Sequence, residues 1–314
     1  MTPVEAIRSL LDSGRPLILD GGLGGELDTR GYDISSPLWS AALIASEPEA
    51  IVTLHRDYLD AGAQCITTSS YQASVTGLQA LGMNPGEVEK LFKLSVELAC
   101  RARDEYLREN PGCEFRPLVA ASVGPYGAYL ADGSEYRGNY GLDDARLREF
   151  HQQRLRWLDD SGADLLACET MPDLQELRVL AGLLQSVSTP AWVSFCCRDA
   201  DHLHDGNGFT RALELFVDHE RVFALGANCC PPALIEPLIA NIVAANSGKL
   251  IVVYPNSGQQ YDADGKHWHG DSELQHWSQQ AEAWFAAGAG LIGGCCSVGP
   301  AHIRELAARK SWHC

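Results

Sequence analysis

The sequence predicts an α/β protein whose single domain, residues 1–314, is a closed (β/α)8 barrel of the TIM type. Two observations carry this prediction: eight short apolar runs are typical of buried strands, and amphipathic stretches separate them. Strands that alternate with helices form a parallel sheet with right-handed crossovers. A barrel of this kind takes about 250 residues, and the chain has 314, of which 46% are hydrophobic. An open doubly wound sheet is the alternative.

The predicted elements follow one another in regular order. The eight strands are PLILD (16–20), AQCITTS (63–69), PLVAASVG (117–124), ADLLACE (163–169), PAWVSFC (190–196), VFALGAN (222–228), KLIVVYP (249–255) and AGLIGG (289–294). Helical patterns between them include 49–62, 87–107 and 147–162. Gly62, Gly162 and Gly288 each stand between a helical stretch and a strand, where a glycine ends a helix without steric cost.

The net charge and the hydrophobicity of the chain restrict the kinds of molecule that it is expected to bind. A formal charge of −17, from 24 basic and 41 acidic residues, disfavours nucleic acid and anionic membranes as partners. The first residues lack the basic and apolar pattern of a signal peptide, and no run approaches the roughly 18 apolar residues of a membrane span. We therefore expect a cytoplasmic protein, whose eleven cysteines serve metal binding or catalysis rather than a disulfide framework.

Polar residues stand at the carboxyl ends of the predicted strands, where barrels of this type carry out their chemistry. Asp20 and Glu169 each end an apolar run. Because an uncompensated carboxylate is costly to bury, these two residues predict a cationic ligand such as an amino group. The alternative is that each caps the helix that follows. Three polar, glycine-rich loops also follow strand ends and are expected to lie over the site: 130–144, 199–210 and 256–273.

Two cysteine motifs follow predicted strands. Cys229 closes the run Gly-Ala-Asn-Cys after the sixth strand, and Cys295 and Cys296 close the run Gly-Gly-Cys-Cys after the eighth. Three thiolates and one open position make the ligand set of a catalytic zinc site. The other interpretation is that these are small buried residues or disulfide partners. Spacing alone leaves further candidate ligands open: Cys196, Cys197, Cys230, His202 and His204.

The chain resembles the zinc-dependent homocysteine S-methyltransferases, whose fold is a (β/α)8 barrel. The two cysteine motifs are highly specific when they occur together. The matching segments run in family order over nearly the whole length: LDGGLGGELDTRG (19–31), AGAQCITTSSYQAS (61–74), ETMP (169–172), GANCCPP (226–232), YPNSG (254–258) and GGCCSVGPAHI (293–303).

The resemblance implies a role for each motif. Family members bind zinc through the cysteine of Gly-x-Asn-Cys and both cysteines of Gly-Gly-Cys-Cys, which are here Cys229, Cys295 and Cys296. They place the acid before the first Gly-Gly and the glutamate that ends the fourth strand around the homocysteine amino group, which implies Asp20 and Glu169.

The remaining positions complete the implied site. The main chain near Gly21 would meet the homocysteine carboxylate, and Thr67 and Asn228 are further expected substrate-binding residues. The other paired cysteines fall outside the family motifs and are taken as structural: Cys196, Cys197 and Cys230.

The implied reaction is methyl transfer to the thiolate of zinc-bound homocysteine, which forms methionine, with Zn²⁺ as the only cofactor. Family donors are S-methylmethionine, S-adenosylmethionine, betaine and methylcobalamin-linked methyltetrahydrofolate. The chain leaves no room for folate and cobalamin modules and stops 18 residues after Cys296, where betaine enzymes carry an extension. It therefore looks most like the stand-alone type that uses S-methylmethionine, with S-adenosylmethionine as a secondary sulfonium donor.

Three alternatives remain at this level. One is a betaine-dependent homocysteine methyltransferase. Another is a zinc hydrolase on the same barrel, which the soft, anionic all-cysteine ligand set disfavours because it suits sulfur better than hydroxide. The third is a structural zinc, which prefers four protein ligands.

Overall fold

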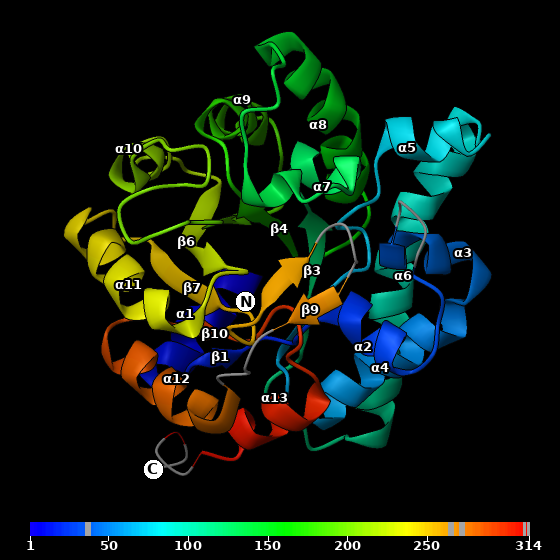
Figure 1. Ribbon diagram of the computed structural model, residues 1–314. Coiled ribbons are helices and arrows are strands. Elements are labelled where there is room, and N and C mark those ends of the chain that lie inside the picture. The colour runs from blue at the N-terminus through cyan, green and yellow to red at the C-terminus, as the bar shows by residue number, and fades with distance from the viewer. Residues whose placement is uncertain (35–38, 263–266, 270–273, 310–311, 313–314) are drawn as a thin grey trace.

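The protein is described by a computed structural model that covers residues 1–34, 39–262, 267–269, 274–309 and 312. Its main sheet has eight parallel strands in the order β1-β10-β7-β6-β5-β4-β3-β2. A parallel bridge between Leu19 and Cys65 joins the two ends of this order, so the sheet closes into a barrel (Figure 1). The predicted (β/α)8 fold is confirmed. The strands are β1 (Leu17–Ile18), β2 (Cys65–Thr67), β3 (Leu118–Val123), β4 (Leu165–Met171), β5 (Ala191–Phe195), β6 (Val222–Asn228), β7 (Leu250–Tyr254) and β10 (Leu291–Ile292).

Helices form a ring around the barrel (Figure 1). The three predicted helical stretches correspond to α4, α6 and α8, and glycines end two of them as expected, since Gly62 has φ +105° and Gly162 has φ +84°. The ring consists of α4 (Pro48–Asp60), α6 (Pro85–Glu109), α8 (Asp144–Asp159), α9 (Leu174–Leu184), α10 (Phe209–Leu213), α11 (Ile235–Ala244), α12 (Trp277–Ala286) and α13 (Pro300–Ala307). Shorter helices lie in the connections: α2 (Leu23–Thr29), α3 (Leu43–Ser46), α5 (Val75–Ala80) and α7 (Tyr126–Leu130).

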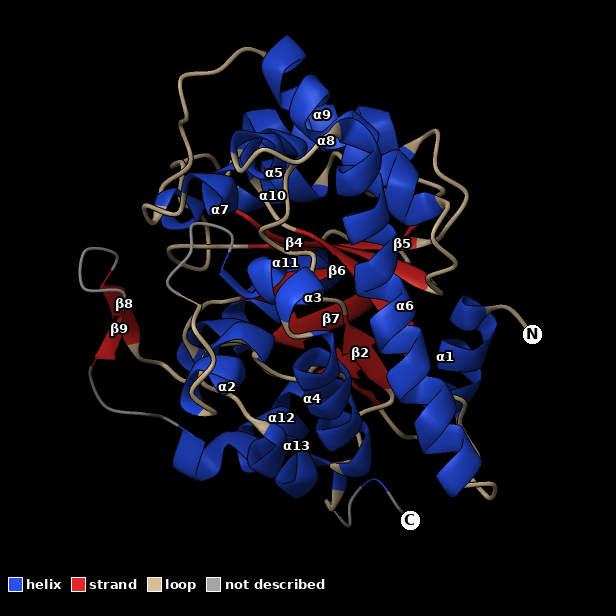
Figure 2. Ribbon diagram, turned by 90° about the vertical axis from the view of Figure 1, so that its right-hand side faces the viewer, coloured by secondary structure: helices blue, strands red, loops and turns tan. Residues whose placement is uncertain are grey.

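Successive strand residues enter two different apolar clusters, as the alternation of side chains along a strand requires. Leu17 and Leu165 belong to the cluster inside the barrel, and their neighbours Ile18 and Leu166 belong to the cluster between the strands and the helices. Helix α1 (Pro3–Asp12) adds apolar residues to the inner cluster and packs against one end of the barrel. Figure 2 shows α1 on one side of the sheet and the small hairpin β8–β9 on the other.

The structure differs from the sequence prediction in two places. The predicted loop 256–273 contains an antiparallel pair, β8 (Gln260–Asp262) and β9 (His267–His269), and part of this loop lies outside the described residues. Strands of three residues are too short for a periodic pattern to reveal. Three barrel strands are also shorter than predicted: β1 and β10 have two residues each and β2 has three.

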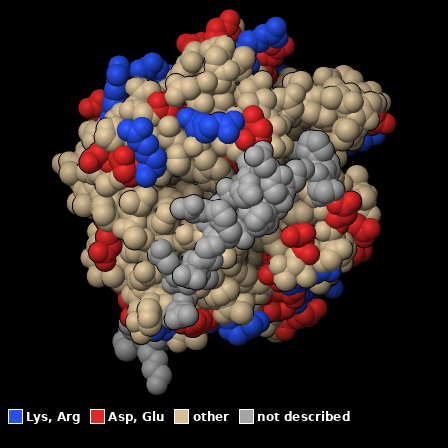
Figure 3. All heavy atoms as spheres, viewed as in Figure 1, with Lys and Arg blue, Asp and Glu red and all other residues tan. Residues whose placement is uncertain are grey.

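The surface and the helices agree with the composition. Acidic and basic side chains are intermixed around the rim of the face in Figure 3, so the net charge of −17 is not concentrated in one patch of the visible described residues. Among the described residues, the structure contains no helix with the length and apolar character needed to span a membrane.

Candidate active site

One pocket lies at the carboxyl ends of the strands, where barrels of this type hold their active sites. Every residue that the sequence singled out as a site residue lines it: Asp20, Gly21, Thr67, Glu169, Asn228, Cys229, Cys295 and Cys296. A wider groove beside α1, at the other end of the barrel, contains none of them. The structure thus brings together groups from β1, β2, β4, β6 and β10.

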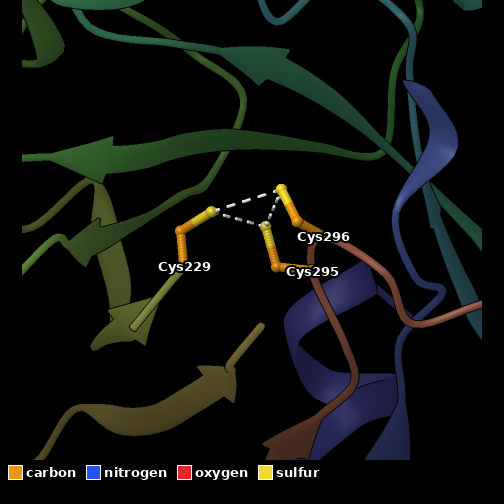
Figure 4. Close-up of side chains that lie close together, drawn as sticks. All are labelled: Cys229, Cys295 and Cys296. Atoms are coloured by element: carbon orange, nitrogen blue, oxygen red, sulfur yellow. Dashed lines mark hydrogen bonds between the residues drawn. The ribbon is translucent and has the colours of Figure 1, made fainter. Parts of the chain in front are cut away.

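Three cysteine sulfurs converge in this pocket. The Sγ atom of Cys229 lies 3.0 Å from that of Cys295 and 3.7 Å from that of Cys296, and the latter two are 3.9 Å apart (Figure 4). Zinc–sulfur bonds of about 2.3 Å in a tetrahedral site place sulfurs about 3.8 Å apart. Among the described residues, this is the one cluster of His, Cys, Asp or Glu with spacing suited to a metal. Its donor set therefore fits a soft, thiolate-bound metal ion with a fourth position facing the pocket.

Close backbone packing holds the two cysteine segments together. Cys229 adopts a left-handed conformation, with φ 54°, and its N–H donates to the Tyr254 carbonyl at 3.2 Å. The N–H of Cys295 donates to the Pro255 carbonyl at 2.8 Å. A Cβ on Gly294 would stand 2.1 Å from Val298 Cγ1, so only glycine lets the chain turn here and present both cysteines to the pocket.

Each of the three sulfurs changes the pKa of its neighbours. Hydrogen bonds donated by Cys295, and then by Cys296, lower the pKa of Cys229 well below its ordinary value. The same contact with Cys229 raises the pKa of Cys295, so one thiolate is held by two thiols. The Tyr136 hydroxyl lies 3.3 Å from Cys229 Sγ. Such neighbours stabilise anionic sulfur, which is the form that binds metal.

The other candidate ligands lie outside the cluster. Cys196, Cys197 and Cys230 are buried, and burial raises the pKa of each thiol. His202 contacts Asp199 at 2.9 Å, and His204 packs its ring against that of Tyr136, with 5.9 Å between centroids. None of the five belongs to the group whose ligand atoms all lie within 4.8 Å of one another, a choice that spacing in the sequence left open.

Asp20 points its carboxylate at the end of β2. The Thr67 N–H donates to one oxygen at 2.7 Å and the Thr67 hydroxyl to the other at 3.1 Å. The side chain is 4% exposed, and burial raises its pKa to about 8, with the nearby charge of Glu169 adding to the shift and Thr67 opposing it. Helix α2 instead begins after Gly22 without a side-chain cap, so the helix-capping alternative does not hold for Asp20.

Glu169 faces the same pocket from β4. It accepts hydrogen bonds from the hydroxyls of Ser122 and Tyr254. Burial nevertheless raises its pKa to about 7, because two neutral donors do not replace the water that a carboxylate loses. Helix α9 begins after Asp173, whose side chain caps it, so Glu169 is likewise free of a capping role. A cation in this pocket would restore the charged form of both acids.

Asn228 and Gly21 shape the pocket through the backbone. Asn228 Oδ1 accepts from the Thr170 N–H at 2.8 Å and from the Ser194 hydroxyl, and its Nδ2 donates to Thr170 Oγ1 at 2.8 Å. Thr170, with φ 60°, directly follows Glu169, so Asn228 fixes the peptide that aims this carboxylate. A Cβ on Gly21 would lie 2.0 Å from the Val298 carbonyl oxygen, which makes glycine necessary there.

Sequence reasoning missed two residues of the pocket wall, Glu135 and Tyr136. Both lie in a short 3-10 turn (Ser134–Tyr136) within the loop 130–144, which the sequence placed over the site. Burial raises the pKa of Glu135 to about 7. The polar run Gly-Ser-Glu-Tyr-Arg has no periodicity, so nothing in it indicated which side chains turn inward.

The raised pKa of Asp20 predicts a pH-dependent stability of the substrate-free protein. The folded pKa of about 8 exceeds the ordinary aspartate pKa of 3.8, so the stabilising effect is complete below pH 4 and is lost as the pH rises through 8. Asp20→Asn is expected to remove this loss, which is at most about 4 kcal/mol between pH 5 and pH 8. Denaturant unfolding at both pH values measures it. The exposed Asp28→Asn is the control, and an unchanged pH dependence in Asp20→Asn would contradict the prediction.

Comparison with known proteins identifies the family of the chain. The sequence model of a family described as homocysteine S-methyltransferase matches residues 17–310. Homocysteine S-methyltransferase YbgG of Bacillus subtilis (strain 168) is 44% identical over 312 residues, covering 97% of this chain and 98% of that protein. The homocysteine S-methyltransferase of Escherichia coli (strain K12) is 45% identical over 314 residues, covering 99% and 100%. The metallated form of the homocysteine methyltransferase MmuM from Escherichia coli has a TM-score of 0.87 at 43% identity, covering 97% of this chain and 99% of that chain.

Proposed function

Because the chain belongs to the homocysteine S-methyltransferase family, we propose that it moves a methyl group from S-methylmethionine to the sulfur of zinc-bound homocysteine. The observation that carries the proposal is the convergence of three cysteine sulfurs beside two buried carboxylates in one pocket. A metal ion held by sulfur ligands would bind the sulfur of the substrate, and the carboxylates would bind its ammonium group.

Zinc is the metal that this ligand set favours. Cys229, Cys295 and Cys296 would hold it as three thiolates, and soft sulfur ligands select zinc over harder metals. When bound, zinc would keep the homocysteine thiol deprotonated at neutral pH. The hydroxyl of Tyr136, 3.3 Å from Cys229 Sγ, supports the anionic sulfur from outside the ligand set, a role that neighbours of metal ligands commonly have.

The two buried acids orient the acceptor. Asp20 and Glu169 would bind the homocysteine ammonium, which offsets the cost of their burial. The main chain at Gly21, next to Asp20 in the sequence, would meet the homocysteine carboxylate. Thr67 acts through Asp20, since both of its hydrogen bonds go to that side chain. Fixing the substrate at three points limits its motion and aims its sulfur toward the donor.

The pocket's charge favours a cationic methyl donor. Among the described residues that line it, three are carboxylates and none is Lys or Arg. In the transfer, the homocysteine sulfur forms a bond to the methyl carbon while the bond between that carbon and the donor sulfur breaks. The electron pair of the broken bond stays on the donor sulfur, which becomes a neutral thioether. With S-methylmethionine both products are methionine, and no proton or redox partner is required.

We expect S-methylmethionine to be the preferred donor. Turnover of homocysteine to methionine, measured with each donor at equal concentration, should be higher with S-methylmethionine than with S-adenosylmethionine or betaine. The two sulfonium donors should inhibit each other competitively, because both must align with one homocysteine sulfur. A higher kcat/KM for betaine would overturn the donor assignment, and independent binding of the two sulfonium compounds would overturn the single in-line geometry.

A further inference from the structure

We propose that Glu135 is the counter-ion for the positive charge of the methyl donor, so that this residue sets the preference for a sulfonium over a neutral compound. The inference rests on the proposed function and adds a donor-recognition residue to it. Four observations carry it: the fixed backbone of the turn, the unpaired carboxylate, the position beside the metal ligands and the aromatic surroundings.

The backbone that carries Glu135 is fixed. A Cβ on Gly127 of α7 would lie 2.5 Å from the Glu135 nitrogen, so the turn packs directly against this helix. On its outer side Arg137 pairs with Asp132 at 3.1 Å, and the Ser134 N–H donates to Asp132 Oδ1 at 3.0 Å. The glutamate is thereby held at the pocket wall rather than carried on a free loop.

The carboxylate of Glu135 differs from the other two acids of the pocket. Asp20 and Glu169 accept hydrogen bonds from the protein, whereas Glu135 Oε2 is buried and has no hydrogen-bond partner. The side chain is 7% exposed, and the nearest basic residue in its turn, Arg137, is already paired with Asp132. The carboxylate accepts a hydrogen bond from its own main-chain N–H, which does not neutralise its charge. A buried carboxylate without a cationic partner is costly, and a bound cation would offset that cost.

Position separates Glu135 from Asp20, and hydrogen bonding separates it from Glu169, whose carboxylate already accepts from Ser122 and Tyr254. Tyr136, the residue next to Glu135, reaches Cys229 Sγ at 3.3 Å, so Glu135 lies on the side of the pocket where the metal ligands stand. The methyl group must arrive there, in line with the metal-bound sulfur. Asp20, by contrast, is tied to the end of β2 through Thr67. Asp20 and Glu169 would therefore bind the homocysteine ammonium, and Glu135 would be left to pair with the positive charge of the donor.

The surroundings suit a sulfonium ion in particular. A sulfonium has a positive charge but no N–H or O–H to donate, so a carboxylate attracts it by charge alone. Tyr71 and Tyr136 line the same pocket, and aromatic faces add cation–π attraction. When the methyl group leaves, the donor becomes neutral and this attraction ends. Glu135 thus stabilises the bound donor at least as much as the transition state, so its removal should raise KM without lowering kcat.

The test uses the metal-loaded protein and two probes of equal shape. S-methylmethionine carries the charge, and 2-amino-5-methylhexanoic acid has a CH group in place of the sulfonium sulfur. We expect Glu135→Gln to raise the KM for S-methylmethionine about tenfold, with kcat not lowered and the KM for homocysteine unchanged. By calorimetry, the variant should lose affinity for S-methylmethionine but not for the neutral probe. Glu135→Asp keeps the charge and should recover part of the loss, while Glu97→Gln, an exposed change on α6, is the control.

The outcomes separate this inference from the proposed function. Equal loss of affinity for the charged and neutral probes would mean that Glu135 only supports the loop, and an increased KM for homocysteine would move its role to the acceptor; either result overturns the inference. Failure of the unaltered protein to turn over S-methylmethionine would overturn the donor assignment instead. The calorimetric comparison does not depend on turnover and still tests Glu135 in that case.

Discussion

Cys229→Ala is expected to remove most of the bound zinc and to lower methyl transfer by at least about a hundredfold. The three sulfurs lie within 3.0–3.9 Å of one another, so the loss of one leaves two ligands and breaks the shared charge of the trio. Zinc per chain, measured by elemental analysis after dialysis, and methionine formation are the two readouts. Cys295→Ala and Cys296→Ala should behave in the same way.

The control for this change is the adjacent residue. Cys230 is also buried, but its sulfur lies outside the metal-spaced cluster, and its main-chain carbonyl accepts from the Asn256 N–H at 3.1 Å. Cys230→Ala keeps that main-chain contact and should retain one zinc and most of the activity. A full zinc content in Cys229→Ala would refute the assignment of this residue as a ligand.

Glu169→Gln and Asp20→Asn are expected to weaken homocysteine binding about a hundredfold while zinc stays in place. Each substitution removes a buried negative charge from the ammonium site, and truncating one partner of a buried charge pair typically has an effect of this size. Homocysteine binding by calorimetry and zinc content are measured on the same samples. Glu149→Gln, which changes an exposed acid on α8, is the control.

The zinc content of these variants decides between two roles. The position of Glu169 next to Thr170, and the link from Thr170 to Asn228, leave this acid close to Cys229, the proposed metal ligand. If the Gln and Asn variants bind homocysteine normally but lose zinc, the acids support the metal instead of the substrate, and the role proposed for them is wrong.

The sequence predicts the position of a site residue best where that residue stands at the end of a clear apolar strand pattern. Glu169 ends one apolar strand and Cys229 directly follows another. Because active sites of (β/α)8 barrels lie at the carboxyl ends of the strands, the sequence alone predicts that both residues lie at that end of the barrel. Asn228 was expected to bind substrate; in the structure its amide contacts Thr170 and Ser194, and contact with substrate stays a prediction.

Other parts of the site depend on contacts that no local pattern encodes. Glu135 reaches the pocket because its turn packs on Gly127, eight positions earlier on another helix. The choice of Cys229 over Cys230 as a member of the cluster follows from a left-handed backbone at Cys229, which directs one sulfur of the pair inward. Adjacent cysteines look alike in a sequence, and only the resemblance to a family separated them.

The order of the strands has a consequence for when the metal can be captured. Cys229 and Cys295 are 66 residues apart, and β10, which precedes Cys295, pairs with β1 at the start of the chain and with β7. A ribosome releases the N-terminal part first, so seven strands are made while the ligand set still has a single sulfur. Binding of a metal by all three sulfurs would therefore wait until β10 has been synthesised and has paired with β1 and β7.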